Sequence, residues 1–95
     1  MINVKITFLS LLADLFGNEP FPILLNEDST IKDIFERLTT KFGKKFKEII
    51  SHNSDSLNKY VLVGLNGKDI RLFEDTTTIL HDGDELSFLP AIAGG

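Results

Sequence analysis

Apolar residues alternate with polar ones between residues 2 and 8, which places Ile2, Val4, Ile6 and Phe8 on one face of a β-strand. A second strand is predicted over residues 21–25. Because Pro20 and Pro22 cannot donate to a strand ladder, we expect this strand at an edge of the sheet. The apolar segment 11–16 between the strands ends at Gly17 and predicts a helical turn that caps the core. Together these segments predict a hairpin with a long loop.

The segment after Thr30 has the period of an amphipathic helix. Thr30 is expected to cap this helix together with Asp33, and Gly43 to end it. An apolar stripe over residues 46–50 predicts a further short helix, and the polar residues 51–59 predict a surface loop. The apolar face of the main helix consists of Ile31, Ile34, Phe35, Leu38 and Phe42.

Three strands are predicted in the second half of the chain, over residues 60–65, around 69–72 and over 85–89. Asn66-Gly67 favours the type I′ turn of a hairpin between the first two, and Asp82-Gly83-Asp84 predicts a tight turn before the third. The order strand, strand, helix, strand, strand, strand predicts an α+β domain. We expect a mixed sheet of about five strands with one main helix across one face.

Composition limits the function of the domain. The chain has 95 residues, enough for one domain but too few to enclose a buried active site easily, so an enzyme acting alone is not expected. A net charge of -4 disfavours nucleic acid as a partner. No apolar run approaches the roughly 20 residues of a membrane helix, and Asp14 interrupts the apolar stretch that resembles a signal peptide. We therefore expect a cytoplasmic protein that binds no membrane.

Few side chains are suited to catalysis. The chain has no Cys, which excludes thiolate chemistry, disulfides and sulfur-ligated metals. His81 beside Asp82 could form an acid–base pair, and Asp82, Asp84 and Glu85 could bind a cation. Turn neighbours do not face one another, however, and the remaining ligands of a calcium loop are missing. We interpret these residues as a solvated turn, and expect no metal site and no bound cofactor.

The chain ends in Pro90-Ala91-Ile92-Ala93-Gly94-Gly95. Glycine lacks a Cβ atom, so the two last residues could thread a narrow channel in another protein. The terminal carboxylate is the one group here that a partner could activate without any side chain of this chain. Because glycine is also common at frayed termini, an inert tail remains an alternative at this point.

Residues 80–95, with their Asp-Gly-Asp-Glu turn, apolar strand, proline and Gly-Gly, resemble the end of MoaD, the sulfur-carrier subunit of molybdopterin synthase. Phe8 with residues 11–17, residues 29–31 and residues 63–67 resemble that family as well. The resemblance covers nearly the whole chain and extends to the related carrier ThiS. It implies a ubiquitin-like β-grasp domain over residues 1–90 and a flexible tail over residues 91–95.

By this resemblance, an E1-like enzyme would use ATP to adenylate the Gly95 carboxylate, which a sulfur donor would convert to a thiocarboxylate. The tail would then enter the large subunit of molybdopterin synthase and pass its sulfur to a cyclic pterin. The chain would be a non-catalytic cosubstrate. The residues expected to bind these partners are Leu89, Pro90, Ile92, Ala93 and Gly94.

One departure from the family leaves the pathway open. MoaD proteins usually have two prolines before the last four residues, whereas here Ala91 follows Pro90. Relatives with the same tail carry sulfur for thiamine or tRNA, or join their terminal glycine to a lysine as ubiquitin-like modifiers. The segment 51–59 resembles an insertion in archaeal members, among which both carriers and modifiers occur. An interaction domain with an inert tail is the third alternative.

Overall fold

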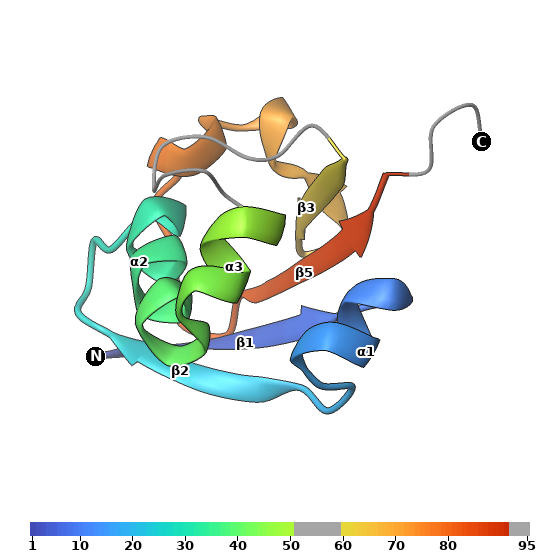
Figure 1. The fold of residues 1–95 in the computed structure, drawn as a ribbon. Helices are drawn as coiled ribbons and strands as arrows, with labels where there is room; N and C mark the ends of the chain where they lie inside the picture. Colours follow the sequence, from blue (N-terminus) through green and yellow to red (C-terminus); the bar gives the residue numbers. More distant parts are fainter. Residues whose placement is uncertain (51–59, 92–95) are drawn as a thin grey trace.

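The computed structural model describes residues 1–50 and 60–91. The elements in chain order are β1 (Ile2–Phe8), α1 (Leu11–Phe16), β2 (Phe21–Leu25), α2 (Ile31–Phe42), α3 (Lys44–Ile49), β3 (Val61–Leu65), β4 (Lys68–Asp69), the 3₁₀ helices Ile70–Leu72 and Asp75–Thr77, and β5 (Glu85–Pro90). The strands form one sheet in the order β2-β1-β5-β3-β4. As predicted, the sheet is mixed, because β5 is parallel to β1 and antiparallel to β3, and α2 crosses one face (Figure 1).

The predicted N-terminal hairpin is confirmed. β1 and β2 are antiparallel, with a register that runs from Ile2 opposite Leu25 to Ile6 opposite Phe21, and α1 lies in the connection between them. β2 is an edge strand, as its two prolines indicated. Arg37 of α2 donates a hydrogen bond to the Leu24 carbonyl at 2.6 Å, which satisfies one acceptor of this edge.

The predicted main helix begins and ends where its capping residues indicate. The Thr30 backbone N–H donates to the Asp33 carboxylate at 2.8 Å, and the Thr30 side chain completes the capping box. Gly43 has a φ of 72°, a left-handed conformation that favours glycine, and ends α2. The short helix expected around residues 46–50 is α3, whereas the loop predicted over residues 51–59 lies outside the described residues.

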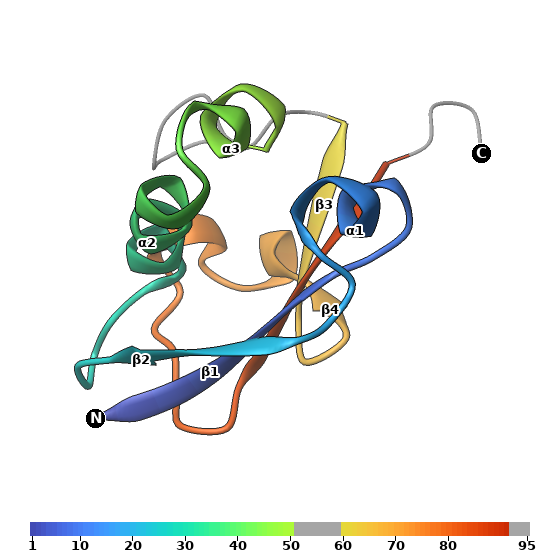
Figure 2. The same cartoon turned by 60° about the horizontal axis from the view of Figure 1, so that its bottom comes forward.

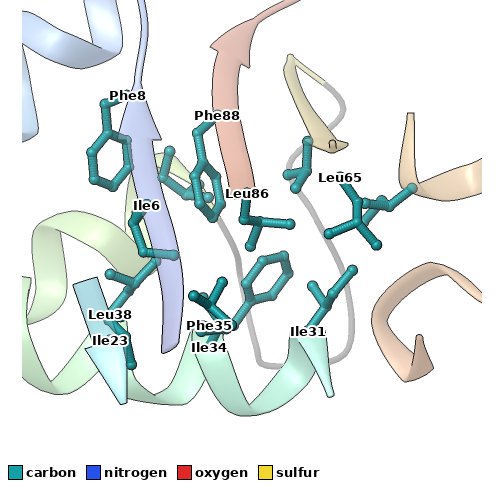
Figure 3. Packing of buried hydrophobic residues seen from close by; sticks show 14 of the residues in the cluster. Ile6, Phe8, Ile23, Ile31, Ile34, Phe35, Leu38, Leu65, Leu86 and Phe88 are labelled. Atoms are coloured by element: carbon teal, nitrogen blue, oxygen red, sulfur yellow. The ribbon is translucent and has the colours of Figure 1, made fainter. Parts of the chain in front are cut away.

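The core lies between the sheet and α2 (Figure 3). Ile31, Ile34, Phe35 and Leu38 of the helix are fully buried against inward-facing residues of β1 and β5. Phe42, predicted to belong to the same face, is only partly buried, because it lies at the rim, where its ring packs edge-on against Phe8 at 5.7 Å. The rings in contact with one another belong to Phe8, Phe16, Phe21, Phe35, Phe42, Phe46 and Phe88.

The β3–β4 hairpin has the predicted turn, with φ values of 52° at Asn66 and 85° at Gly67. The fourth strand, predicted around residues 69–72, is present and pairs with β3, but it is shorter than predicted, because β4 comprises only Lys68–Asp69. The Asp69 carboxylate accepts a hydrogen bond from the Arg71 backbone N–H at 2.9 Å. This local bond turns the chain into a 3₁₀ helix and directs Ile70 into the core.

Candidate functional site

The C-terminal tail begins at the best-anchored strand of the sheet. β5 is the central strand and is hydrogen-bonded to β1 on one side and to β3 on the other. Figure 2 shows how it runs between its two neighbours toward the C-terminus. Pro90 lies opposite Val61 in the register, and the Ala91 N–H donates to the Tyr60 carbonyl at 2.8 Å. The first residue of the predicted tail is therefore still held by the sheet.

Ala91 occupies the position where the resembling family has its second proline. Proline has no N–H and could not form the bond that Ala91 donates to Tyr60. With alanine at position 91, the chain lacks the rigidity of a second proline. It gains a backbone hydrogen bond between Ala91, which follows β5, and Tyr60, which precedes β3. Backbone hydrogen bonds of the sheet therefore hold the chain as far as Ala91.

An aromatic cluster fixes β5 beneath the origin of the tail. The Phe88 ring is fully buried and stacks on Phe8 at 5.1 Å, with Phe35 at 5.9 Å and Phe46 at 6.1 Å. The Leu9 N–H donates to the Phe88 carbonyl at 2.9 Å and continues the β1–β5 ladder toward α1. This end of β5 is therefore held by its neighbours in the sheet and by the core.

The face of the sheet away from the helices differs from the inner face. Outward positions of β5 alternate with the buried Leu86 and Phe88, and the outward positions of β3 alternate with Val63 and Leu65. A hollow of about 260 Å³ lies on this outer face. It is lined by Leu9, Leu62, Val63, Gly64, Gly67, Asp69, Ser87 and Leu89.

Charged groups around this face pair with one another. Asp69 accepts hydrogen bonds from the Arg71 guanidinium, the shortest at 2.6 Å, and these bonds hold the pKa of the Asp69 carboxyl below its usual value. The same contact raises the pKa of Arg71. Lys5 and Glu85 form an ion pair at 3.2 Å across β1 and β5. Two ion pairs, Asp69–Arg71 and Lys5–Glu85, thus lie on the same face as the apolar side chains of the hollow.

The acidic turn near residue 82 stabilises the fold. Asp82 accepts a hydrogen bond from the Asn3 backbone N–H at 2.7 Å. Asp84 accepts one from the His81 backbone N–H at 2.7 Å and another from the Asn66 side chain at 3.0 Å. The His81 ring is 80% exposed, and its Nδ1 atom lies 4.0 Å from Asp84 rather than facing Asp82. The carboxylates join this turn to β1 and to the Asn66-Gly67 turn, and the carboxylate beside the histidine ring is that of Asp84.

Two residues that the sequence predicts for partner binding are described, and both lie at the origin of the tail. Leu89 and Pro90 are partly buried at the end of β5, with Leu89 in the wall of the hollow. Ile92, Ala93, Gly94 and Gly95 lie outside the described residues. Sequence reasoning did not identify Leu9, Leu62, Gly64 and Ser87 as members of the same site, because they come from three separate segments.

The part of the chain that the structure describes contains neither a metal-binding cluster nor a membrane-spanning helix. Residues 1–50 and 60–91 contain no group of three or more His, Asp or Glu side chains placed to hold a metal ion. Within the same ranges, no helix is long and apolar enough to cross a membrane.

Comparison with solved structures defines the class of protein. The chain superposes on small archaeal modifier protein 1 from Methanosarcina acetivorans with a TM-score of 0.78, at 28% identity over 100% of this chain and 98% of the other. A protein from Pyrococcus furiosus called "Putative molybdopterin converting factor, subunit 1" shares the fold at a TM-score of 0.73, with 24% identity over 97% of this chain and 100% of the other. The predicted ubiquitin-like β-grasp fold is confirmed.

Sequence comparison then gives the family. The model of the ThiS family matches residues 6–95, so the chain belongs to this family of ubiquitin-like sulfur carriers and modifiers. One relative, from Archaeoglobus fulgidus, is named "Putative sulfur carrier protein" and is 29% identical over 69 residues, 73% of this chain and 77% of its own. Another is ubiquitin-related modifier 1 of Saccharomyces cerevisiae, 27% identical over 99 residues, with 100% of both chains covered.

Proposed function

We propose that this chain is a sulfur carrier whose Gly95 carboxylate is converted to a thiocarboxylate and donates its sulfur to molybdopterin synthesis. The observation that carries the proposal is the family match, which extends through Gly94 and Gly95 to residue 95. The structure supports it, because the tail begins at the central strand of a small, well-anchored sheet. We further propose that the chain acts in the cytoplasm as a cosubstrate and contributes no catalytic side chain.

Activation of the tail takes two steps, both carried out by partners. An E1-like enzyme lets an oxygen of the Gly95 carboxylate attack the α-phosphorus of ATP, which forms an acyl adenylate and releases pyrophosphate. A sulfide-level donor then attacks the carbonyl carbon, and AMP leaves with the electron pair of the broken C–O bond. An ionised carboxylate is a poor electrophile, so the adenylate supplies the leaving group that direct attack would lack.

Sulfur transfer follows in the large subunit of molybdopterin synthase, once for each of the two sulfurs of the dithiolene. The thiocarboxylate sulfur forms a C–S bond to a carbon of the cyclic pterin precursor, and the C–O bond at that carbon breaks, so that the oxygen substituent leaves with the electron pair. Water then cleaves the carrier from sulfur and restores the Gly95 carboxylate. The similarity of fold to the Pyrococcus furiosus molybdopterin converting factor supports this recipient. ATP is bound by the activating enzyme in this scheme, and the carrier itself binds no cofactor.

A second candidate function is protein modification, favoured by full-length similarity to ubiquitin-related modifier 1. There a lysine amine of a target protein attacks the same acyl adenylate, or a thioester derived from it, and forms an isopeptide bond. Sulfur delivery to tRNA or thiamine starts from the same thiocarboxylate. All these routes share the activation of Gly95 and differ in the acceptor.

The test uses the full chain, the cognate E1-like enzyme, ATP and sulfide, with intact mass spectrometry of the product. We expect exchange of one oxygen for sulfur at Gly95, followed by dithiolene formation when the synthase large subunit and the pterin precursor are added. Isopeptide-linked conjugates without dithiolene would favour the modifier function. Absence of any adenylation would contradict both.

Two matched variants locate the reacting group. Deleting Gly95, or adding one residue after it, moves the carboxylate by about 3.3–3.6 Å along an extended chain, which destroys near-attack geometry in the partner. We expect both variants to lose thiolation and to melt at the temperature of the parent, because the change adds or removes only a terminal residue. Thiolation of the deletion variant at the parental rate would show that the Gly-Gly end is inert.

A further inference from the structure

The connection between α2 and α3 carries a concentration of positive charge. Residues 41–48 contain four lysines and one glutamate, so this segment has a net charge of +3 in a chain whose net charge is -4. The four lysines, which we call the lysine patch, are all exposed, and they are Lys41, Lys44, Lys45 and Lys47. The function proposed above uses none of these side chains.

Aromatic rings hold two lysines of the patch in place. The Lys41 Nζ atom lies over the Phe21 ring, 5.0 Å from its centroid. The Lys45 Nζ atom lies 5.2 Å from the centroid of the Phe16 ring and donates a hydrogen bond to the Leu15 carbonyl. A surface lysine ordinarily loses much of its rotamer freedom when a partner binds it. Here part of that freedom is already lost in the free protein, which favours association.

The chain neutralises the lysine patch only in part. Lys44 forms an ion pair with Glu48 at 3.6 Å, and both side chains are largely exposed. Within residues 1–50 and 60–91, no carboxylate forms an ion pair with Lys41, Lys45 or Lys47. The groups that hold Lys41 and Lys45 are rings and a carbonyl, which carry no formal charge. The patch can therefore bind further anionic groups.

We propose that the lysine patch binds an acidic segment of a partner protein, in which several Asp or Glu side chains lie close together. The inference does not depend on the function proposed for the tail. The cations are spread over the end of α2 and over α3, and this spacing suits several carboxylates better than one small anion. Complementary charges of this kind speed the encounter of two proteins and fix their orientation.

The charge of the whole chain favours a protein over a nucleic acid as the occupant. The residues outside 41–48 have a net charge of -7, since the chain has -4 and this segment +3, and they would repel a long polyanion. Single-stranded nucleic acids also stack their bases on open aromatic faces. Lys41 and Lys45 occupy a face of Phe21 and of Phe16, respectively. A short acidic segment needs to contact only the patch.

The lysine patch and the hollow lie on opposite sides of the sheet. α2 and α3 are on the inner side, as Figure 2 shows, whereas the hollow is on the outer face. Lys41 and Lys45 lie near the end of the sheet where β1 finishes, because the rings beneath them, Phe21 and Phe16, pack against Phe8. An acidic segment bound to the patch would therefore leave the hollow uncovered.

Titration of the full, isotope-labelled chain with hexaglutamate, followed by NMR, tests the inference, with hexaglutamine as the uncharged control. We expect hexaglutamate to shift the amide signals of residues 41–48 and of the neighbouring Leu15 and Phe16, and hexaglutamine to shift none. The Kd should rise with salt concentration, because salt screens exposed charges.

Two double variants separate the patch from net charge. Lys41→Gln/Lys45→Gln should raise the Kd for hexaglutamate by about tenfold, because it removes the two lysines that are already ordered. The matched control, Lys5→Gln/Lys68→Gln, removes the same charge from exposed positions of the sheet and should raise the Kd less than about twofold. Equal weakening in both variants would overturn the inference, because net charge alone would then attract the peptide.

A further pair of variants tests the ordering of Lys41. Phe21→Leu keeps every charge and removes the ring beneath Lys41, so we expect a rise in Kd of about threefold. Phe21→Tyr keeps the ring and should have the parental Kd. A thermal melt of each variant confirms folding. A parental Kd in folded Phe21→Leu would contradict the role of the ring.

Three other results would assign the lysine patch to a different occupant. Tighter binding of oligouridylate than of hexaglutamate at the same residues would assign it to nucleic acid. Tighter binding of vesicles of phosphatidylcholine and phosphatidylserine would assign it to a membrane. Self-association of the parent that Lys41→Gln/Lys45→Gln abolishes would assign it to a second copy of the chain. Each of these would overturn the proposed acidic segment.

Discussion

The two faces of the sheet are made from the same strands but differ in the size, polarity and burial of their side chains. The inner face presents large apolar residues such as Ile6, Phe88 and Leu86, all fully buried beneath α2. The outer face presents Thr7, Ser87 and Gly64 with exposed or partly exposed leucines around them. Folding explains the composition of the first face, because each residue has a packing partner. It explains the second less well, because the packing of the described residues requires neither the glycine at position 64 nor the exposed side chain of Leu9.

The largest effect should come from the inner face. Phe35→Ala should lower the free energy of unfolding by about 3–5 kcal/mol, since Phe35 is fully buried and touches the rings of Phe46 and Phe88. Chemical denaturation followed by circular dichroism measures this loss. The outer-face control Leu62→Ala should cost much less, and equal losses for the two variants would contradict the distinction between the faces.

A charge on the outer face should affect binding more than folding. Leu89→Asp should raise the Kd for the E1-like enzyme by about 30-fold, equivalent to the roughly 2 kcal/mol of an interface hot spot, because it places a carboxylate among the leucines of the hollow. Isothermal titration calorimetry gives the Kd, and a thermal melt of the same sample reports folding. A variant that unfolds would place Leu89 in the core and the interface elsewhere.

Much of this architecture can be predicted from the sequence where the signal is local. The capping box of Thr30 with Asp33, the stop at Gly43 and the Asn66-Gly67 turn depend on residues within one turn of each other. The fourth strand was predicted too far along the chain. It ends at Asp69 because the Asp69 side chain bonds to the Arg71 backbone, a contact that strand propensity does not include.

Only part of the candidate site could be predicted from the sequence, because the rest depends on contacts between distant segments. The position of Leu89 and Pro90, just before the predicted tail, indicated them as candidates for partner binding. The hollow forms only when β3 pairs with β5 and Leu9 follows β1, and this pairing joins residues that are more than 20 positions apart. Gly64 carries no signal in the sequence, since it lines the hollow without contributing a side chain.

A smaller effect should come from Thr7, on the outer face of β1. Its hydroxyl is shielded from solvent and has no hydrogen-bond partner among the described residues. Thr7→Val removes the unsatisfied hydroxyl at nearly constant shape and should stabilise the fold by about 1 kcal/mol, seen as a rise of roughly 4–8 °C in Tm.

The matched control for this variant is Thr78→Val. The Thr78 hydroxyl is buried, donates to the Asp75 carbonyl at 2.7 Å and accepts from the Glu74 N–H at 3.0 Å. Its removal should destabilise the fold by about 1–3 kcal/mol. Loss of stability in both variants would mean that Thr7 has a partner in solution.

The smallest effect concerns the ion pair at the border of the hollow. Arg71 lowers the pKa of Asp69, chiefly through side-chain hydrogen bonds, so the folded protein binds a proton at Asp69 less readily than the unfolded chain. The stabilisation is therefore present above the unfolded pKa of Asp69 and is lost as the pH falls through the lower folded value. It should be slight, because the Arg71 side chain is 67% exposed and the pair is therefore screened by water. NMR titration of the Asp69 carboxyl carbon should show a midpoint below the usual value that rises in Arg71→Ala. In Lys5→Ala, which removes the other cation of this face, the midpoint should stay near that of the parent. An Asp69 midpoint that does not change in Arg71→Ala would show that the pair does not persist in solution.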